Sequence, residues 1–216
     1  KSYAANDNDY MTSLVIRSSK FSFYLLFLLS LPIILEINQI LKFWLINVPT
    51  YAPIFTILIL VIILITSISG PLKIAVQATG KIAVYQAMIG TLLFLTLPIS
   101  YVFLKLGYPP EVTLYITIVI EIVALIFRFF FLQKLIGFPV FRFFKDVVVR
   151  NIIIVVFSTS LPLFVRFKMD ANFWRLIIIV CIALIWNAII IYIVGLNKSE
   201  KKIIQIGMQR ISQKIN

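Results

Sequence analysis

The sequence predicts an all-α fold, a polytopic membrane helix bundle with about six transmembrane helices. Apolar residues make up 62% of the 216 residues and charged residues 13%, and the mean hydropathy is +1.06. Ordinary globular proteins contain about 45–50% apolar and about 25% charged residues, so a soluble fold could not bury this much apolar surface. The apolar runs are continuous and do not alternate with polar residues, which favours helices over a β-barrel.

Six segments are long and apolar enough to cross a bilayer, which takes about 20 residues. Charges or helix breakers bound each segment; Lys20 and Lys42 flank the first, and Gly70-Pro71 is expected to close the second. The fifth is the weakest because Arg150 lies within it, so a re-entrant or tilted segment is the alternative there. The expected spans are residues 21–41, 54–72, 83–104, 112–132, 147–165 and 176–196, which together form a six-helix bundle over residues 21–196.

The distribution of lysine and arginine predicts the orientation of these spans, since short cytoplasmic loops carry an excess of both. Fourteen lie on one side and five on the other, so we expect both ends of the chain to be cytoplasmic. This asymmetry accounts for the net charge of +12 without a nucleic-acid partner, because the basic residues are scattered between spans. The basic side holds Lys1, Arg17, Lys20, Lys73, Lys81, Lys134, Arg142, Lys145, Arg150, Lys198, Lys201, Lys202, Arg210 and Lys214, and the opposite side holds Lys42, Lys105, Arg166, Lys168 and Arg175.

Both ends of the chain differ in composition from the bundle. Residues 1–20 are expected to be a cytoplasmic loop, and a start at Lys1 without a signal peptide favours a fragment of a longer protein over a processed mature chain. Residues 197–216 are expected to be a basic amphipathic cytoplasmic tail, either a helix on the anionic leaflet or a disordered segment. The helical interpretation rests on the spacing of Ile204, Met208, Ile211 and Ile215, with Lys201, Lys202, Arg210 and Lys214 elsewhere around the helix.

A second cytoplasmic segment, residues 134–145, is expected to lie at the membrane interface. It interleaves phenylalanines with basic residues, a combination typical of the headgroup level. The residues concerned are Lys134, Phe138, Phe141, Arg142, Phe143, Phe144 and Lys145.

The sequence argues against an enzyme. It contains no histidine and one cysteine, Cys181, which removes the commonest general base and most zinc sites. It has no Walker motif or glycine-rich phosphate loop, so ATP hydrolysis is not encoded in it. We therefore expect no catalytic residue, no metal and no cofactor.

Three ionisable residues within the spans are candidates for substrate binding or ion coupling. Glu121 lies near the middle of the fourth span, where a charge costs roughly 3 kcal/mol on insertion scales. Arg128 lies seven residues later on the same helical face, from which it can reach the headgroups or approach Glu121 through water. A structural pair within the bundle is the alternative for Glu121. Glu36 lies in the outer half of the first span, and its alternative is a solvated position at the outer interface.

Three prolines are candidates for hinges or for positions lining a cavity. Pro32, Pro98 and Pro162 each follow a Ser-Leu or Thr-Leu pair and lie on spans that run outward from the cytoplasm. The chain therefore resembles three successive two-span hairpins. Proline kinks a membrane helix, and kinked helices with internal repeats are common in transporters. Chance is the alternative, because proline is frequent in membrane helices.

Several short segments together resemble bacterial polysaccharide flippases of the O-antigen, or Wzx, type. Residues 40–55, ILKFWLINVPTYAPIF, are similar to that family's pattern of an apolar run, Trp-Leu, a turn, proline, Tyr-Ala and phenylalanine, although the family often has glycine where Asn47 stands. Pro71-Leu72 with residues 78–81 and Tyr85-Gln86 resembles its next turn, and residues 97–101 with 105–107 resemble the following hairpin. The resemblance covers about residues 3–150 by such segments and the last two spans by hydropathy alone.

This resemblance implies membership of the MATE-like multidrug/oligosaccharidyl-lipid/polysaccharide exporter superfamily, with this chain as its C-terminal part. The implied architecture is two helix bundles around a central cavity, so an N-terminal bundle would be missing. The implied substrate is an undecaprenyl-diphosphate-linked oligosaccharide, moved across the bacterial inner membrane by alternating access. Membrane lipid and a coupling proton or sodium ion are the other expected partners.

Three other functions remain as alternatives. A cation-coupled multidrug exporter of the same superfamily would share the fold, and the Glu121 carboxylate would suit a cationic substrate. A membrane enzyme of glycan or lipid assembly is a further alternative, but Asp146 and Asp170 stand alone on opposite sides of the membrane. A membrane scaffold without transport activity is the third.

Overall fold

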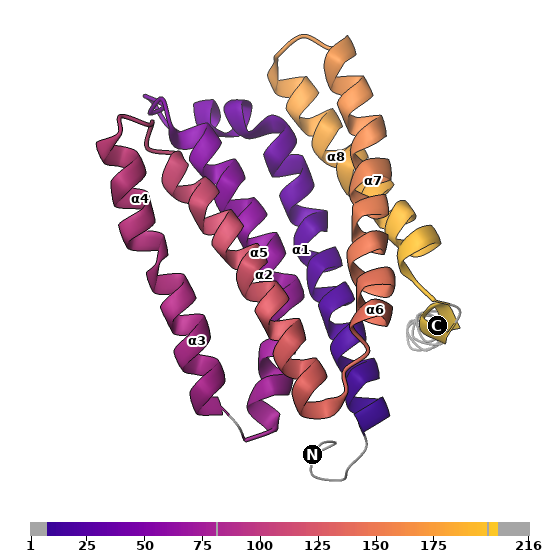
Figure 1. The fold of residues 1–216 in the computed structure, drawn as a ribbon. Coiled ribbons are helices and arrows are strands. Elements are labelled where there is room, and N and C mark those ends of the chain that lie inside the picture. Colours follow the sequence, from indigo (N-terminus) through magenta and orange to yellow (C-terminus); the bar gives the residue numbers. More distant parts are fainter. Residues whose placement is uncertain (1–7, 81, 198, 203–216) are drawn as a thin grey trace.

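The computed structural model describes residues 8–80, 82–197 and 199–202, and within these residues the chain forms helices joined by short turns, without strands. Figure 1 shows the long helices side by side and alternating in direction. This confirms the predicted all-α bundle. In chain order the elements are α1 (Asn8–Trp44), α2 (Ala52–Ala78), α3 (Ile82–Phe94), α4 (Thr96–Lys105), α5 (Val112–Ile136), α6 (Val140–Phe143), the π-helix η1 (Phe144–Val149), α7 (Arg150–Lys168), α8 (Phe173–Ile190) and the π-helix η2 (Ile191–Gly195).

Six helical segments in this part of the chain are long and apolar enough to cross a membrane: Asp9–Trp44, Ala52–Ala78, Ile82–Lys105, Val112–Ile136, Val140–Lys168 and Phe173–Gly195. The fifth, made of α6, η1 and α7, runs 29 residues without a break, long enough for a full crossing despite Arg150. The chain is therefore a multi-pass membrane protein. We call the end of the bundle at which α1 begins the basic end, and the opposite end the far end.

Two expected boundaries differ from the structure. Helix α1 begins at Asn8, so residues 8–20, expected as loop, continue the first span as helix. Helix α2 passes through Gly70-Pro71 and ends at Ala78 instead of near Leu72. A proline interrupts a membrane helix less than a sequence pattern suggests, because neighbouring groups satisfy the freed carbonyl.

Turns at the two ends of α5 depend on glycine. Gly107 (φ +86°), after α4, and Gly137 (φ +65°), after α5, adopt the left-handed backbone that glycine enters without steric cost. The backbone N–H of Gly137 donates to the carbonyl of Gln133, which satisfies one of the last carbonyls of α5. The chain then re-enters the bundle as α6. These short turns set α4 against α5 and connect α5 to α6.

Helix α1 is the centre of the bundle, between α2 on one side and the α7–α8 hairpin on the other (Figure 1). Half of the most apolar window of its span is buried, against 11% for the α3–α4 span at the edge. One apolar cluster joins α1, α2, α3, α5 and the α6–η1 segment, and a second joins α1, α7 and α8 with Leu64 of α2 at its edge. Any relative movement of the two sides must therefore act on α1.

The expected interfacial segment, residues 134–145, is only partly exposed. Phe141 and Phe144 are exposed, but Phe138 and Phe143 are almost completely buried and pack on each other within the first apolar cluster. Two of the four rings therefore pack inside the bundle and do not face lipid, and the position of the segment at the headgroup level stays a prediction. The cause of this packing is the tight turn at Gly137, after which the Phe143 ring packs against Phe129 of α5 at 5.1 Å between centroids.

We expect the two ends of the bundle to lie on opposite sides of the membrane, with the basic end cytoplasmic. Thr50 and Asn172 at the far end and Gly80 and Ser199 at the basic end are all exposed. After replacement of Cys181 by alanine, single cysteines at Thr50 and Asn172 should react with an impermeant thiol reagent added outside. Cysteines at Gly80 and Ser199 should react only after permeabilisation, and the opposite pattern would reverse the orientation.

Candidate functional site

The structure brings Glu121 and Arg128 into an ion pair on α5. The distance from Arg128 Nη1 to Glu121 Oε2 is 3.5 Å, and their side chains are only 7% and 12% exposed. Seven residues are two helical turns, so the two side chains extend along one face toward each other. Arg128 therefore pairs directly with Glu121, instead of contacting the headgroups or approaching Glu121 through water as expected.

Tyr85 of α3 holds the arginine of this pair from the neighbouring span. Arg128 Nε donates a hydrogen bond of 3.2 Å to the Tyr85 hydroxyl, and Tyr85 is 1% exposed. The Tyr85 ring in turn meets Phe131 edge to face at 5.7 Å between centroids. The charge pair is therefore fixed between two spans, and we name Glu121, Arg128 and Tyr85 the central cluster.

The central cluster is not fully hydrogen-bonded. Glu121 Oε2 and Arg128 Nη1 are buried, and neither hydrogen-bonds to any residue that the structure describes. Buried polar atoms normally have hydrogen-bond partners, so these two atoms, which face each other at 3.5 Å, call for an explanation such as a functional role or a bound water or ion. A carboxylate in this state can accept a hydrogen bond from a ligand or contact a cation. The cluster is thus suited to ion coupling or to contact with a polar substrate.

Glu36 lies in a second cluster, at the far end. It is 1% exposed, which is incompatible with the solvated interfacial position considered for it. Its Oε2 accepts a hydrogen bond of 3.0 Å from Arg175 Nη2 at the start of α8, and Arg166 Nε of α7 lies 3.7 Å from Oε1. We name Glu36, Arg166 and Arg175 the far cluster; it ties α1 to both arms of the α7–α8 hairpin.

The local structure positions Arg175 and Glu36 in the far cluster. The Asn172 side chain caps α8 by accepting a hydrogen bond of 2.7 Å from the Arg175 backbone N–H, and the Arg175 guanidinium donates to the carbonyl of Met169. The backbone of Glu36 departs from helical geometry (φ −116°, ψ 23°). Beyond this point the last turns of α1 bend across the top of the bundle (Figure 1).

The three proline candidates have different local effects. Pro98 follows an interruption at Leu95, between α3 and α4, as expected from a ring that removes a donor and crowds the preceding turn. Pro32 lies inside α1, four residues before the irregular backbone of Glu36. Pro162 lies inside α7 without interrupting it. The structure therefore places a helix irregularity near two of the three prolines.

A polar chain crosses the second apolar cluster and joins three spans. Ser158 Oγ of α7 donates to Asn187 Oδ1 of α8 at 3.1 Å, and Asn187 Nδ2 donates to the carbonyl of Phe27 in α1 at 3.3 Å. Ser158 and Asn187 are completely buried. Hydrogen bonds between membrane helices typically contribute about 0.6 kcal/mol each. This chain fixes how α1, α7 and α8 pack against one another.

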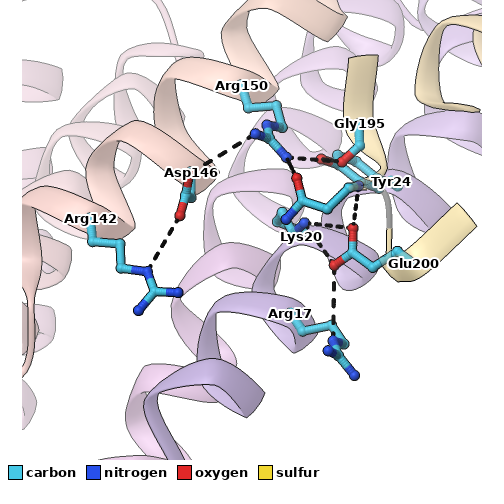
Figure 2. A network of polar contacts seen from close by, with 9 residues as sticks. Arg17, Lys20, Tyr24, Arg142, Asp146, Arg150, Gly195 and Glu200 are labelled. Atoms are coloured by element: carbon cyan, nitrogen blue, oxygen red, sulfur yellow. Dashed lines mark hydrogen bonds and ion pairs between the residues drawn. The ribbon is translucent and has the colours of Figure 1, made fainter. Parts of the chain in front are cut away.

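A third charged group, the basic-end cluster, surrounds the residues that follow η2 (Figure 2). Lys20 Nζ of α1 donates to both carboxylate oxygens of Glu200 at 2.9 Å, and Arg17 Nε lies 3.9 Å from Glu200 Oε1. The Lys20 and Glu200 side chains are 2% and 6% exposed. The pair thus joins positions 180 residues apart in the sequence.

Helix α7 belongs to the same cluster. Arg150 Nη1 donates to Asn197 Oδ1 at 2.6 Å and to the carbonyl of Gly195 at 3.4 Å, and the Tyr24 hydroxyl also donates to that carbonyl, at 3.1 Å. Asp146 in η1 lies between Arg142 and Arg150 (Figure 2), 3.7 Å and 4.0 Å from them. The carbonyl of Gly195, at the end of η2, therefore accepts hydrogen bonds from two other helices, α1 and α7.

Several of these residues were not expected from the sequence. Tyr85, Arg166 and Arg175 had no assigned role in a site, and Glu200 was not singled out. Glu200 follows Asn197 by three residues, the spacing at which a glutamate bonds back to the residue that caps its helix. Its Oε2 does accept from the Asn197 backbone N–H at 2.8 Å, so this spacing was the available signal. Residues 203–216, with the expected amphipathic face, lie outside the described residues.

The residues that the structure describes contain no group of three or more histidine, cysteine or carboxylate side chains placed to hold a metal. Asp146 and Asp170 lie at opposite ends of the bundle, in η1 and after α7. The fold and its buried charges together define a multi-pass helical membrane protein with ion pairs inside its spans. No protein-family model matches the chain, and comparisons with curated proteins and with solved structures found no match.

Proposed function

We propose that this chain forms one helix bundle of a transporter that flips a polyprenyl-diphosphate-linked oligosaccharide across the bacterial inner membrane. The observation that carries the transport role is the ion pair of the central cluster. A charged residue inside a membrane span is costly and is a functional site by default. Here the charges are paired but incompletely hydrogen-bonded, an arrangement that favours an exchangeable role over a static one.

The architecture supports a moving protein. Two spans are irregular near a proline, at Glu36 in α1 and at Leu95 between α3 and α4. Two π-helical segments, η1 and η2, lie at the basic ends of the last two spans, and such segments are frequent at functional sites. Irregular membrane helices are common where transporters bind substrate or bend.

The substrate class comes from the resemblance to polysaccharide flippases. A sugar-diphosphate headgroup is large and anionic, so its path should be cationic, while the polyprenyl tail remains in lipid. Arg128, Arg166 and Arg175 are deep or partly buried cations, but each is paired with a glutamate. Most of the required positive charge must therefore come from a second bundle, either another part of a longer protein or another subunit.

A cation-coupled multidrug exporter is the second candidate, and Glu121 is the observation that favours it. A buried carboxylate can exchange a proton or sodium ion for an organic cation. Such an exporter would confer resistance to cationic dyes, and Glu121→Gln would remove that resistance without affecting glycan export. A flippase would show the reverse dependence.

The proposal predicts that the chain does not transport alone, because one bundle cannot enclose a path open alternately to both sides. In a strain that lacks its polysaccharide flippase, the chain alone should leave surface glycan absent, although it is present in the membrane. Co-expression with the protein segment that supplies the second bundle should restore glycan. Restoration by the chain alone would replace the two-bundle arrangement with a homodimer.

A further inference from the structure

The basic-end cluster has the geometry of an intramolecular docking site. We infer that Asn197 and residues 199–202, called the latch, form a releasable attachment, in which Glu200 binds a cationic site formed by Lys20 and Arg17 at the basic ends of α1, α7 and α8 (Figure 2). The latch is independent of the substrate and of the proposed function. It controls whether the residues that follow η2 stay attached to α1 and α7 at the basic end.

The docking site is built to receive a carboxylate. Lys20 donates two hydrogen bonds of 2.9 Å to Glu200 from α1. Within the latch itself, the Asn197 backbone N–H donates to Glu200 at 2.8 Å and fixes the direction of its carboxylate. Charge-assisted hydrogen bonds of this length are among the strongest in proteins. The Glu200 carboxylate is therefore the group on which attachment of the segment depends.

The same segment also contacts α7, so release would remove its attachment to α1 and α7 at the same time. Asn197 accepts from Arg150 while its backbone begins the short helix that presents Glu200. Leu196 connects Asn197 to Gly195, the last residue of η2. Gly195 lies directly against the Tyr24 ring, where an added Cβ would come within 3.0 Å of ring carbon. The latch is thus seated on α1 by polar contacts and one close backbone approach.

The contacts that hold the latch can open without unpacking the apolar core. Arg17 is 48% exposed, so water reaches the edge of the docking site. Asn197 and residues 199–202, the described part of this segment, belong to neither apolar cluster. A segment held by a few polar contacts at the rim of a bundle opens at lower free energy than the packed helices do. Local release is therefore separable from unfolding.

Protonation of Glu200 should also open the latch. Burial by itself would raise the pKa of the Glu200 carboxyl, but the Asn197 N–H, Lys20 and Arg17 outweigh burial and lower it below its ordinary value of 4.5. A lowered pKa means that docking is fully stabilised above the ordinary value and weakens as pH falls toward the lowered one. The other charged or titratable groups facing the segment are Arg150, Tyr24 and Asp146.

The direct test measures the distance between α1 and the latch in proteoliposomes. With Cys181 replaced by alanine, spin labels at the exposed positions Ser18 and Lys202 should give one short, narrow distance distribution at pH 7. Glu200→Gln should shift most molecules to long, broad distances, a loss of at least about tenfold in the ratio of docked to released latch. The matched control Asp170→Asn neutralises an exposed far-end carboxylate and should leave the distribution unchanged.

Two further measurements separate a latch from a fixed part of the fold. A reference distance between labels at Thr50 and Asn172 should not change in Glu200→Gln. The double variant Glu200→Gln with Lys20→Met should show no larger released fraction than either single variant, because both changes remove the same interaction. In the unsubstituted latch, lowering the pH stepwise from 4.5 toward the lowered pKa of the Glu200 carboxyl should progressively and reversibly lengthen the Ser18–Lys202 distance, even if Glu200→Gln fails to fold. An unchanged Ser18–Lys202 distance in Glu200→Gln and at low pH, or a simultaneous change at the far end, would overturn the inference.

Discussion

Replacing Glu36 by alanine is expected to destabilise the protein severely. The substitution leaves Arg175, whose side chain is only 12% exposed, and Arg166 facing each other without a carboxylate. Removing one partner of a buried ion pair typically costs about 3–5 kcal/mol, because the remaining charge is left without compensation. The expected result is a large drop in the thermal midpoint, measured in detergent by the loss of monodisperse protein.

The same measurement distinguishes a charge effect from a packing effect. Asp170→Asn removes an exposed carboxylate at the same end of the bundle and should leave the midpoint unchanged. Replacing all three residues of the far cluster by apolar ones, Glu36→Met with Arg166→Leu and Arg175→Met, should recover most of the loss, since well-packed apolar residues can replace a buried ion network. A midpoint for Glu36→Ala equal to that of Asp170→Asn would show that the far cluster contributes little.

Replacing Glu121 by glutamine is expected to abolish coupled transport while the protein remains abundant in the membrane. Glutamine keeps the shape of the side chain and removes its titration. If Glu121 carries one proton per cycle, each proton that crosses a membrane potential of 100 mV supplies about 2.3 kcal/mol. Loss of coupling would therefore lower the substrate gradient that the transporter can maintain by roughly fiftyfold. The measurement is surface glycan together with membrane abundance, for the complete transporter with and without Glu121→Gln.

A purely structural pair would give a different pattern. Arg128 would keep its hydrogen bond to Tyr85 but lose its counter-charge, so abundance would fall. The double change Glu121→Gln with Arg128→Gln would then restore abundance. Normal glycan export by Glu121→Gln would remove the central cluster from the transport mechanism.

The sequence was sufficient to predict features that depend on neighbouring residues. Runs of apolar residues predicted six spans, because a bilayer of fixed thickness requires a fixed length of helix. The seven-residue separation of Glu121 and Arg128 placed both on one face of α5, and the structure confirms their proximity. The irregularities near Pro32 and Pro98 likewise follow from local chemistry.

Features that depend on packing between distant helices could not be predicted in this way. Glu36 meets Arg175 across 139 positions and Lys20 meets Glu200 across 180. A uniformly apolar span has no polar face to indicate its neighbours, so periodicity does not say which helices touch. Glu36 was therefore considered interfacial, although the α7–α8 hairpin folds over it. The burial of Phe138 and Phe143 was missed for the same reason.

The most direct test of the proposed function is a flipping measurement with purified protein in proteoliposomes of defined lipid. A polyprenyl-diphosphate oligosaccharide with a labelled sugar is placed in both leaflets, and its protection from an added glycosidase is followed with time. The complete two-bundle protein should expose the protected half of the substrate, and the Glu121→Gln variant and this chain alone should not. Equal protection with the complete protein and with empty vesicles, or rapid exposure by this chain alone, would contradict the proposal.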